Sequence, residues 1–367
     1  MSRRFIITII TVLVIGVSAG VAIFFAKGYT FSPQEKKILG TGIINISSEP
    51  DAASVFIDGH LTTATNATIS SLKPKNYTVR VVKEGFIPWE KTVTVKVGLV
   101  TALKVTLFPS IPTIYPLTFS GVQNPTLSPD GSKLAYIVPV KTSGGEVNKK
   151  SGVWVWTLIR NQPIAFARSA EPHQISSSQF IDFTSATLRF SPNSKQVLAT
   201  VAAQNWLLNA DNFNADPRDI TAILEATLSS WAEDEENKEA ARIATIKNES
   251  FRKIASDSAT LSWAPDETKF MVKSENVKVY DLEENTEYQI PAAKLHLWLP
   301  DSRHIIMVEE DSISVLDFDG TNKAVIFAGT FLDNFVFPWP DSSRLVIIST
   351  LPTPTAQEPN LYGINLR

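Results

Sequence analysis

LSPDGSKLAYI at residues 127–137 decides the fold, because variants of this segment recur along the C-terminal part of the chain. The other copies are FSPNSKQVLAT at 190–200, WAPDETKFMVK at 263–273, WLPDSRHIIMV at 298–308 and PWPDSSRLVII at 338–348. In each copy, a proline followed by aspartate or asparagine predicts a tight turn. An apolar strand begins five residues after each proline. The repeat therefore predicts a series of similar β-sheets.

The spacing of the central prolines predicts how many sheets there are. Pro265, Pro300 and Pro340 are 35 and 40 residues apart, which is the size of a four-stranded propeller blade. The two earlier spacings are 63 and 73 residues, so they require insertions. The polar segment 140–151 is expected to be a loop of the first blade.

A helical insertion is expected at about residues 216–255, between the second and third repeats. Apolar residues recur there at helical spacing: Ile220, Ile223, Leu224, Leu228 and Trp231. Asp216 is a suitable N-cap with Pro217 at the first helical position, so the helix is expected to begin there. Without this insertion, roughly 215 residues remain, enough for about five blades, or six if one is degenerate.

The repeats resemble those of TolB-type and prolyl-oligopeptidase-type β-propellers, in which Ser-Pro-Asp-Gly precedes an apolar strand. Residues 127–137 match this pattern almost completely. The other copies replace the glycine with Ser194, Glu267, Ser302 and Ser342. The resemblance implies a TolB-like, WD-type propeller over residues 117–367, after a Pro-rich hinge at 109–116. It implies no particular function, because such propellers serve many roles.

Residues 43–108 are expected to form a small β-sandwich. Apolar residues alternate with polar ones in short runs, as half-buried strands do: Ile44, Ile46, Val55, Ile57, Tyr77, Val79, Val81, Val93, Val95, Val97, Leu103, Val105 and Leu107. Three motifs resemble the PEGA domain family: SEPDAASVFIDG at 48–59, LKPKNY at 72–77 and KEGFIPW at 83–89. Ala52 and Lys75 stand where the family has glycine, which suggests locally different turns. The family is mainly prokaryotic, and the resemblance brings no catalytic residues.

The N-terminal segment 5–25, FIITIITVLVIGVSAGVAIFF, contains no charged residue. A helix of this length spans a bilayer of about 30 Å and exceeds the apolar part of a signal peptide. We expect residues 1–28 to be a cytoplasmic stub and an uncleaved transmembrane helix, with a linker at 29–42. Small residues at 18–20 leave cleavage of a signal peptide as the alternative. Gly16 and Gly20 form a G-x-x-x-G pattern that permits two helices to approach.

Composition excludes several classes of function. The chain has 367 residues, a net charge of −3, no cysteine and four histidines. This charge offers no polycationic surface for nucleic acid, and the lack of cysteine excludes disulfides, thiolate nucleophiles and Cys-ligated zinc. His296 and His304 flank the fourth repeat turn and are expected at an edge or on the surface.

Two further patterns are interpreted as structural. Asp317-x-Asp319-Gly320 predicts a hairpin turn, because Ala328 stands where an EF-hand loop needs glutamate. Tryptophans at repeated positions are expected to pack between blades, with stacking on sugars as the alternative: Trp154, Trp156, Trp263, Trp298 and Trp339. The sequence therefore assigns no catalytic, cofactor-binding or metal-ligating residue, and no cofactor.

The order of the segments predicts a non-enzymatic, single-pass protein of the cytoplasmic membrane with its C-terminal domains on the extracytoplasmic side. The PEGA-like domain would be a stalk, and the propeller would bind an envelope protein or a cell-wall glycan. A sensor or assembly subunit that dimerises through its helix is one alternative. A hydrolase or lyase in the mouth of the propeller is the other.

Overall fold

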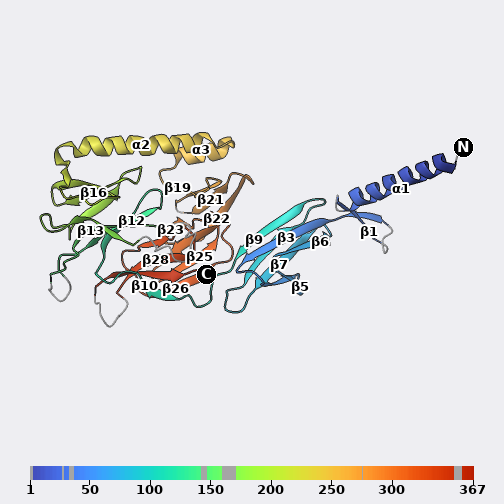
Figure 1. Cartoon of the computed structure of the whole chain (residues 1–367), viewed down its shortest axis with the longest axis horizontal. Helices are drawn as coiled ribbons and strands as arrows, with labels where there is room; N and C mark the ends of the chain where they lie inside the picture. The colour runs from blue at the N-terminus through green and yellow to red at the C-terminus, as the bar shows by residue number, and fades with distance from the viewer. Residues whose placement is uncertain are drawn as a thin grey trace. The chain divides into compact units, whose positions relative to one another are not determined.

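The computed structural model describes residues 3–26, 29–32, 37–141, 147–158, 171–274, 276–350 and 358–367 (Figure 1). The chain divides into two compact units. Unit 1 is Met1–Ile111 with Arg367, and unit 2 is Pro112–Leu366. The described residues are mainly β-strands, as the repeats predict.

Unit 1 begins with helix α1 (Arg3–Ala26), over the residues where a membrane span is expected. Within the part of the chain that the structure describes, no helix combines the length and the apolar character needed to cross a membrane. The transmembrane span predicted at 5–25 is therefore not confirmed. The predicted linker at 29–42 contains a hairpin of β1 (Tyr29–Ser32) and β2 (Lys37–Gly40).

The rest of unit 1 is a sandwich of two sheets. One sheet has the order β6–β3–β9 and the other β5–β4–β7–β8, and β3 and β9 are parallel. The strands are β3 (Gly42–Glu49), β4 (Ser54–Ile57), β5 (His60–Ala64), β6 (Ala67–Leu72), β7 (Asn76–Val82), β8 (Trp89–Thr94) and β9 (Val100–Thr106). The predicted alternation holds, since Ile44, Val55 and Val79 are fully buried between the sheets.

Two details of this sandwich differ from the prediction. Val97 is 45% exposed, because β8 ends at Thr94 and residues 95–99 form a turn instead of extending the strand. Ala52 occupies the place of the family glycine with a φ of 53°, so the turn is kept and alanine adopts a left-handed conformation.

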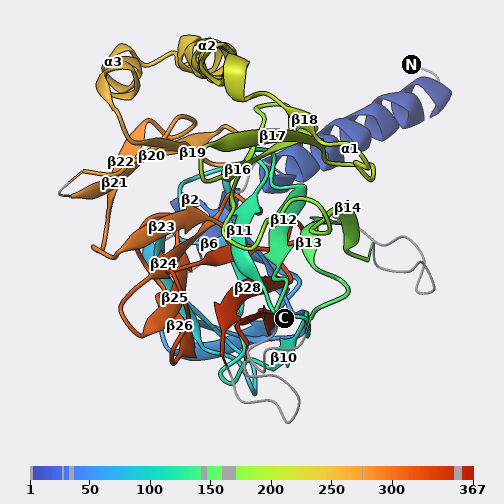
Figure 2. The ribbon, with the colours of Figure 1, turned by 90° about the vertical axis from the view of Figure 1, so that its left-hand side faces the viewer.

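Unit 2 consists of five four-stranded antiparallel sheets arranged around a common centre (Figure 2). The first four are formed by consecutive strands. The first sheet contains β11 (Gln123–Leu127), β12 (Lys133–Val138), β13 (Gly152–Thr157) and β14 (His173–Ser177), and the second contains β15 (Thr187–Phe190), β16 (Gln196–Val201), β17 (Gln204–Asn209) and β18 (Arg218–Asp219). The third contains β19 (Leu261–Trp263), β20 (Lys269–Val272), β21 (Val277–Asp281) and β22 (Thr286–Ile290). The fourth contains β23 (Leu295–Trp298), β24 (His304–Val308), β25 (Ser312–Asp317) and β26 (Ala324–Ala328).

The fifth sheet combines strands from both ends of unit 2. Its order is β10 (Ile114–Pro116), β29 (Asn360–Asn365), β28 (Arg344–Ser349) and β27 (Val336–Pro338). Each predicted proline turn joins two neighbouring antiparallel strands, as the repeat requires. The pairs are β11 and β12, β15 and β16, β19 and β20, β23 and β24, and β27 and β28. The described residues of unit 2 form no sixth sheet. This is the topology of a propeller with five blades, which we number by their proline turns.

The helical insertion lies between blades 2 and 3. After the short helix η1 (Thr221–Ile223), α2 (Leu224–Ala244) packs Trp231 against Leu198 on one face of blade 2. Helix α3 (Glu249–Asp257) packs Phe251 against Phe270 on one face of blade 3. The opposite faces of these blades pack on blades 1 and 4. Helices therefore cover the two faces that would otherwise pack sheet against sheet.

The predicted start of the insertion is wrong. Arg218 and Asp219 pair with β17 as strand β18, so the chain is extended just after Pro217 and helix begins only at Thr221. Asn248 provides a cap at α3, where its side chain accepts hydrogen bonds from the backbone N–H groups of Ser250 and Phe251.

In each repeat turn, the residue two positions after the proline adopts a left-handed backbone conformation. Gly131 has a φ of 68°, and the non-glycine residues at the same position have a φ of 59° in each blade: Ser194, Glu267, Ser302 and Ser342. For a residue with a Cβ, this conformation costs roughly 1–2 kcal/mol. The turn is therefore dictated by the proline and the aspartate, and the glycine only lowers its cost.

Ser342→Gly is expected to raise the free energy of unfolding by about 0.5–1 kcal/mol, since glycine adopts a φ of 59° without a Cβ clash. Urea unfolding followed by tryptophan fluorescence measures the change. Ser302→Gly is the matched control, because the Ser302 hydroxyl accepts a hydrogen bond from the Asp266 N–H at 3.0 Å and its loss offsets the gain. An equal gain in both variants would contradict this account.

Candidate functional site

A cavity of about 800 Å³ opens where the proline turns of blades 1, 3, 4 and 5 meet helix α2. The turns contribute proline rings and serines, and the strand ends before them contribute apolar side chains. Its lining includes Pro129, Asp130, Leu158, Glu239, Arg242, Trp263, Pro265, Glu267, Trp298, Pro300, Phe337 and Pro340. We call it the axial cavity. Most of its lining comes from the repeat itself.

Helix α2 forms one wall of the axial cavity and is held to blade 3 by two polar contacts. The indole N–H of Trp263 donates a hydrogen bond to Glu239 Oε1 at 2.7 Å. Arg242 Nε donates to Glu267 Oε1 at 2.8 Å, and both side chains are about half exposed. On the other side, Lys238 Nζ donates to the carbonyl of Pro192 in the turn of blade 2 at 2.9 Å. The position of this wall thus depends on both blades.

The axial cavity is mildly acidic. Asp130 Oδ1 accepts hydrogen bonds from Ser128 Oγ, the Ser132 N–H and Ser132 Oγ at 2.6, 3.0 and 2.7 Å. Partial burial alone would raise the pKa of Asp130, but these hydrogen bonds outweigh it and hold the pKa below its usual value. With Glu239 and Glu267 against Arg242, the lining has an excess of two negative charges.

A position that sequence reasoning missed lies four residues after each proline. It carries a long polar side chain at the start of the second strand: Lys133, Gln196, Lys269, His304 and Arg344. In blades 1, 3 and 4 these side chains make buried or half-buried polar contacts. The signal is visible in the repeat, but a charge at a strand end is ordinarily interpreted as a surface residue.

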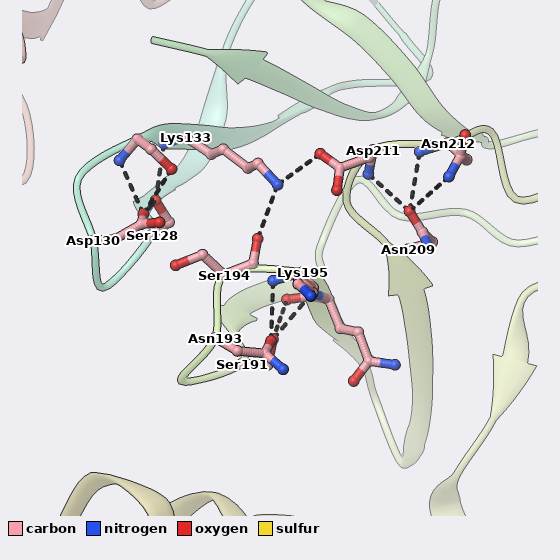
Figure 3. Close-up of polar contacts among 12 residues, drawn as sticks. Ser128, Asp130, Lys133, Ser191, Asn193, Ser194, Lys195, Asn209, Asp211 and Asn212 are labelled. Atoms are coloured by element: carbon pink, nitrogen blue, oxygen red, sulfur yellow. Dashed lines mark hydrogen bonds and ion pairs between the residues drawn. The ribbon is translucent and has the colours of Figure 1, made fainter. Parts of the chain in front are cut away.

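In blade 1, this position connects two blades (Figure 3). Lys133 Nζ donates to the backbone carbonyl of Ser194 at 3.0 Å and lies 2.6 Å from Asp211 Oδ1, both in blade 2. The Lys133 side chain is only 12% exposed. Lys133 therefore joins the turn of blade 1 to blade 2 beside the axial cavity.

Lys133→Met is expected to lower the free energy of unfolding by about 1–2 kcal/mol, because a charge-assisted hydrogen bond across two blades is lost. Urea unfolding measures it. Lys278→Met is the control, because Lys278 pairs with Glu287 at 3.0 Å through side chains that are 39% and 50% exposed, and its loss should change stability by less than about 0.5 kcal/mol. Equal losses of stability in the two variants would show that the Lys133 contact between blades stabilises the fold no more than the Lys278–Glu287 pair does.

In blades 3 and 4, the same position forms buried ionic contacts. Lys269 Nζ lies 3.8 Å from Asp281 Oδ2, and both side chains are under 9% exposed. His304 Nδ1 lies 2.6 Å from Asp301 Oδ2, and its Nε2 lies 3.4 Å from Asp317 Oδ1. Burial lowers the pKa of His304, but hydrogen bonds and charges from Asp301 and Asp317 outweigh it and raise the pKa to about 9. His304 is thus a buried imidazolium between two carboxylates.

The prediction that the two histidines lie on the surface is wrong, because His296 and His304 are 2% and 3% exposed. His296 lies on β23, an edge strand of its sheet, and His304 lies on β24, an interior strand. His296 Nε2 lies 2.9 Å from the carbonyl oxygen of Pro291, and burial lowers the pKa of this imidazole. In the described residues, no group of three or more histidine or acidic side chains is placed to hold a metal ion.

The other two structural interpretations agree with the geometry. Asp317 and Asp319 form a hairpin turn, in which the Thr321 N–H donates to Asp319 Oδ1 at 3.2 Å. Trp156 and Trp339 pack edge to face between blades 1 and 5, with ring centroids 5.3 Å apart. Trp263 and Trp298 are exceptions in part, since they also line the axial cavity.

Comparison with known proteins gives one family match. Residues 41–111 match the PEGA domain family, which agrees with the resemblance found in the three motifs. A search of curated proteins found no match.

Solved structures similar to the chain include propellers. A protein assigned as TolB from Agrobacterium tumefaciens is 14% identical, with 64% of this chain and 76% of that chain covered and a TM-score of 0.24. TolB from Acinetobacter baumannii is 12% identical, with 80% and 62% covered and a TM-score of 0.24, so the chain spans less than two thirds of it. The β-propeller domain of the Trilobed protease from Pyrococcus furiosus is 13% identical, with 68% and 69% covered and a TM-score of 0.22.

The assignment of the two units depends on different observations. The PEGA assignment depends on the family match, and the propeller assignment depends on the five sheets and their order. Residues 41–111 are therefore similar to the PEGA domain family, and unit 2 has the sheet topology of a β-propeller with a helical insertion.

Proposed function

We propose that this protein is a non-enzymatic binding protein of the cell envelope, anchored by α1 in the cytoplasmic membrane, with the PEGA domain as a stalk. The propeller would face the extracytoplasmic side and bind a segment of an envelope protein or a cell-wall glycan. The observation that carries the binding role is the axial cavity, with its tryptophans and its excess of negative charge. These features suit a ligand that has both apolar surface and positive charge.

Exposed apolar side chains on α1 support the anchoring. The described side chains of Ile10, Leu13 and Ile15 are 56–62% exposed, and Val12 and Val17 are exposed to a similar degree. Burying such side chains in lipid removes them from water at roughly 25 cal/mol per Å². Arg3 and Arg4 precede the apolar run, which fits an N-terminus on the cytoplasmic side.

Photocrosslinking tests the binding role. A photoreactive amino acid is placed at Glu267, at the edge of the axial cavity, in the full-length protein in native membranes. The control carries it at Val325, which is 50% exposed on the outermost strand of blade 4. Light-dependent adducts with protein or glycan at Glu267 but not at Val325 are expected. Equal labelling at the two positions, or none at Glu267, would refute the proposal.

A second candidate, a subunit that dimerises through α1, is favoured by open space around two glycines. A Cβ at Gly16 or Gly20 would meet no atom within 4 Å, so another helix could approach this face closely. Crosslinking of the full chain in membranes tests it, with Gly16→Leu and Gly20→Leu expected to abolish a dimer. A dimer that persists in both variants would exclude this face.

A further inference from the structure

One end of the PEGA sandwich lies where the chain enters it from α1. The Gly98 N–H donates to the Thr41 carbonyl at 2.9 Å, and the Ile43 N–H donates to the Leu99 carbonyl at 3.1 Å. The Val95 N–H donates to the Lys75 carbonyl at 3.0 Å. The turn at 95–99 and the turn before β7 are thus held together at the start of β3.

This end of the sandwich is close to the C-terminus of α1. Tyr29 follows Ala26, the last residue of α1, by three positions and pairs with Gly40 across the β1–β2 hairpin. Val97 packs directly against Gly40, where a Cβ would collide with its side chain. Three residues of chain and one spacing between paired strands lie between the end of α1 and Val97. The end of α1 and Val97 are therefore at most roughly 15–20 Å apart. This bound follows from chain connectivity and pairing.

The side chains at this end are apolar and basic. Val97, Leu99 and Val100 are 45%, 56% and 60% exposed. Lys73, Lys75 and Lys96 are also exposed there. We call these six residues the proximal patch. Asp58, which lies 2.7 Å from Lys75, is the acidic residue beside them and leaves a net charge of +2.

The opposite end of the sandwich has a different character. The turns there expose the carboxylates of Glu49, Asp51 and Glu84. Val82 pairs with Ser54 at that end, whereas Asn76 pairs with Thr94 at the end of the proximal patch. Lys83 and Ile111 also lie near that end, where Lys83 Nζ donates to the Asp51 carbonyl at 2.7 Å. The run of exposed apolar residues flanked by lysines is at the end that α1 enters.

We propose that the proximal patch contacts the lipid surface from which α1 emerges. Val97, Leu99 and Val100 enter the headgroup region, and the lysines bind anionic lipid headgroups. Apolar side chains flanked by lysine are the features by which proteins bind at a bilayer interface. The inference depends on the proposed anchoring by α1, and it would hold the stalk against the membrane instead of leaving it free on a linker.

Fluorescence quenching in vesicles tests the contact. The chain contains no cysteine, so Leu99→Cys in the full-length protein takes a single environment-sensitive dye. The protein is reconstituted in vesicles of phosphatidylcholine and phosphatidylglycerol that contain a lipid with a nitroxide at the headgroup. The control is Glu84→Cys, an exposed site at the opposite end. At Leu99 we expect a blue shift and loss of more than roughly half of the fluorescence, and little change at Glu84.

Three outcomes are distinguishable. If the protein does not float with vesicles, the anchoring itself fails. If it floats but the two dyes are quenched equally, the anchoring stands and the proximal patch is refuted. The variant Lys73→Glu/Lys96→Glu changes two exposed side chains and should reduce quenching at Leu99 in anionic vesicles but not in pure phosphatidylcholine. Unchanged quenching in that variant would overturn the role of the lysines.

Discussion

His304→Leu is expected to lower the free energy of unfolding by about 3–5 kcal/mol, because it leaves two buried carboxylates without their cation. His304 is in contact with Asp301 and Asp317 through its two ring nitrogens at 2.6 and 3.4 Å. Leucine fills a similar volume but restores neither hydrogen bond. The loss therefore reports the uncompensated charge more than a cavity.

The contribution of His304 should depend on pH in a defined direction. Its pKa is raised from 6.5 to about 9 in the folded protein, so folding favours the protonated form. This stabilisation is fully present below pH 6.5 and is lost as pH rises through about 9, and the shift corresponds to about 3 kcal/mol. The native protein should lose this stability between pH 6.5 and 9.5, whereas His304→Leu should not.

Urea unfolding at several pH values, followed by tryptophan fluorescence, measures both effects. His296→Leu is the matched control in the same blade. Burial lowers the pKa of His296, so folding favours its neutral form and acidification below pH 6.5 reduces stability. The two substitutions should thus remove pH dependences of opposite sign. Identical pH profiles for the native protein and His304→Leu would refute the buried imidazolium.

Trp231→Ala is expected to release α2 from blade 2, with a loss of about 3–5 kcal/mol in the local free energy of opening. Trp231 is 7% exposed and packs with Leu198 and Ile220, while most of α2 is in contact with solvent. Because Glu239 and Arg242 lie on the same helix, the axial cavity would lose one wall. Partner crosslinking at Glu267 should fall in parallel.

Amide hydrogen exchange measures this release. Peptides from 224–244 should exchange faster in Trp231→Ala, while strands of blades 4 and 5 keep their protection. Ile223→Ala is the control, since Ile223 is 46% exposed and its truncation should change stability by less than about 0.5 kcal/mol. Uniformly faster exchange over unit 2 would show that α2 is needed for the whole propeller instead.

The repeat made much of the fold predictable. Proline turns and the apolar strands after them have a local cause, so the turn at Pro129 and the strand from Leu134 could be placed from the sequence. The PEGA strands were predictable for the same reason, because a two-sheet sandwich imposes strict alternation on residues such as Val79.

Features that depend on distant partners could not be predicted. His304 is buried because strand register places it opposite Asp317, and the sequence does not reveal this register. The start of the helical insertion was wrong because β17 recruits Arg218 into a strand, a tertiary effect that overrides the cap at Asp216. The location of α2 and α3 between two blades depends on which sheet faces are left uncovered.

Strand β10 has a consequence for how the molecule is made. Ile114 pairs with Ile364, and Thr118 hydrogen-bonds Asn360, so the fifth sheet is completed only by residues 242 or more positions apart in the chain. Such distant contacts fold slowly because a long loop must be closed before they form. During synthesis, β10 must wait unpaired until nearly all of the propeller has emerged from the ribosome. Chains cut short before β29 would keep this strand edge open for association with other chains.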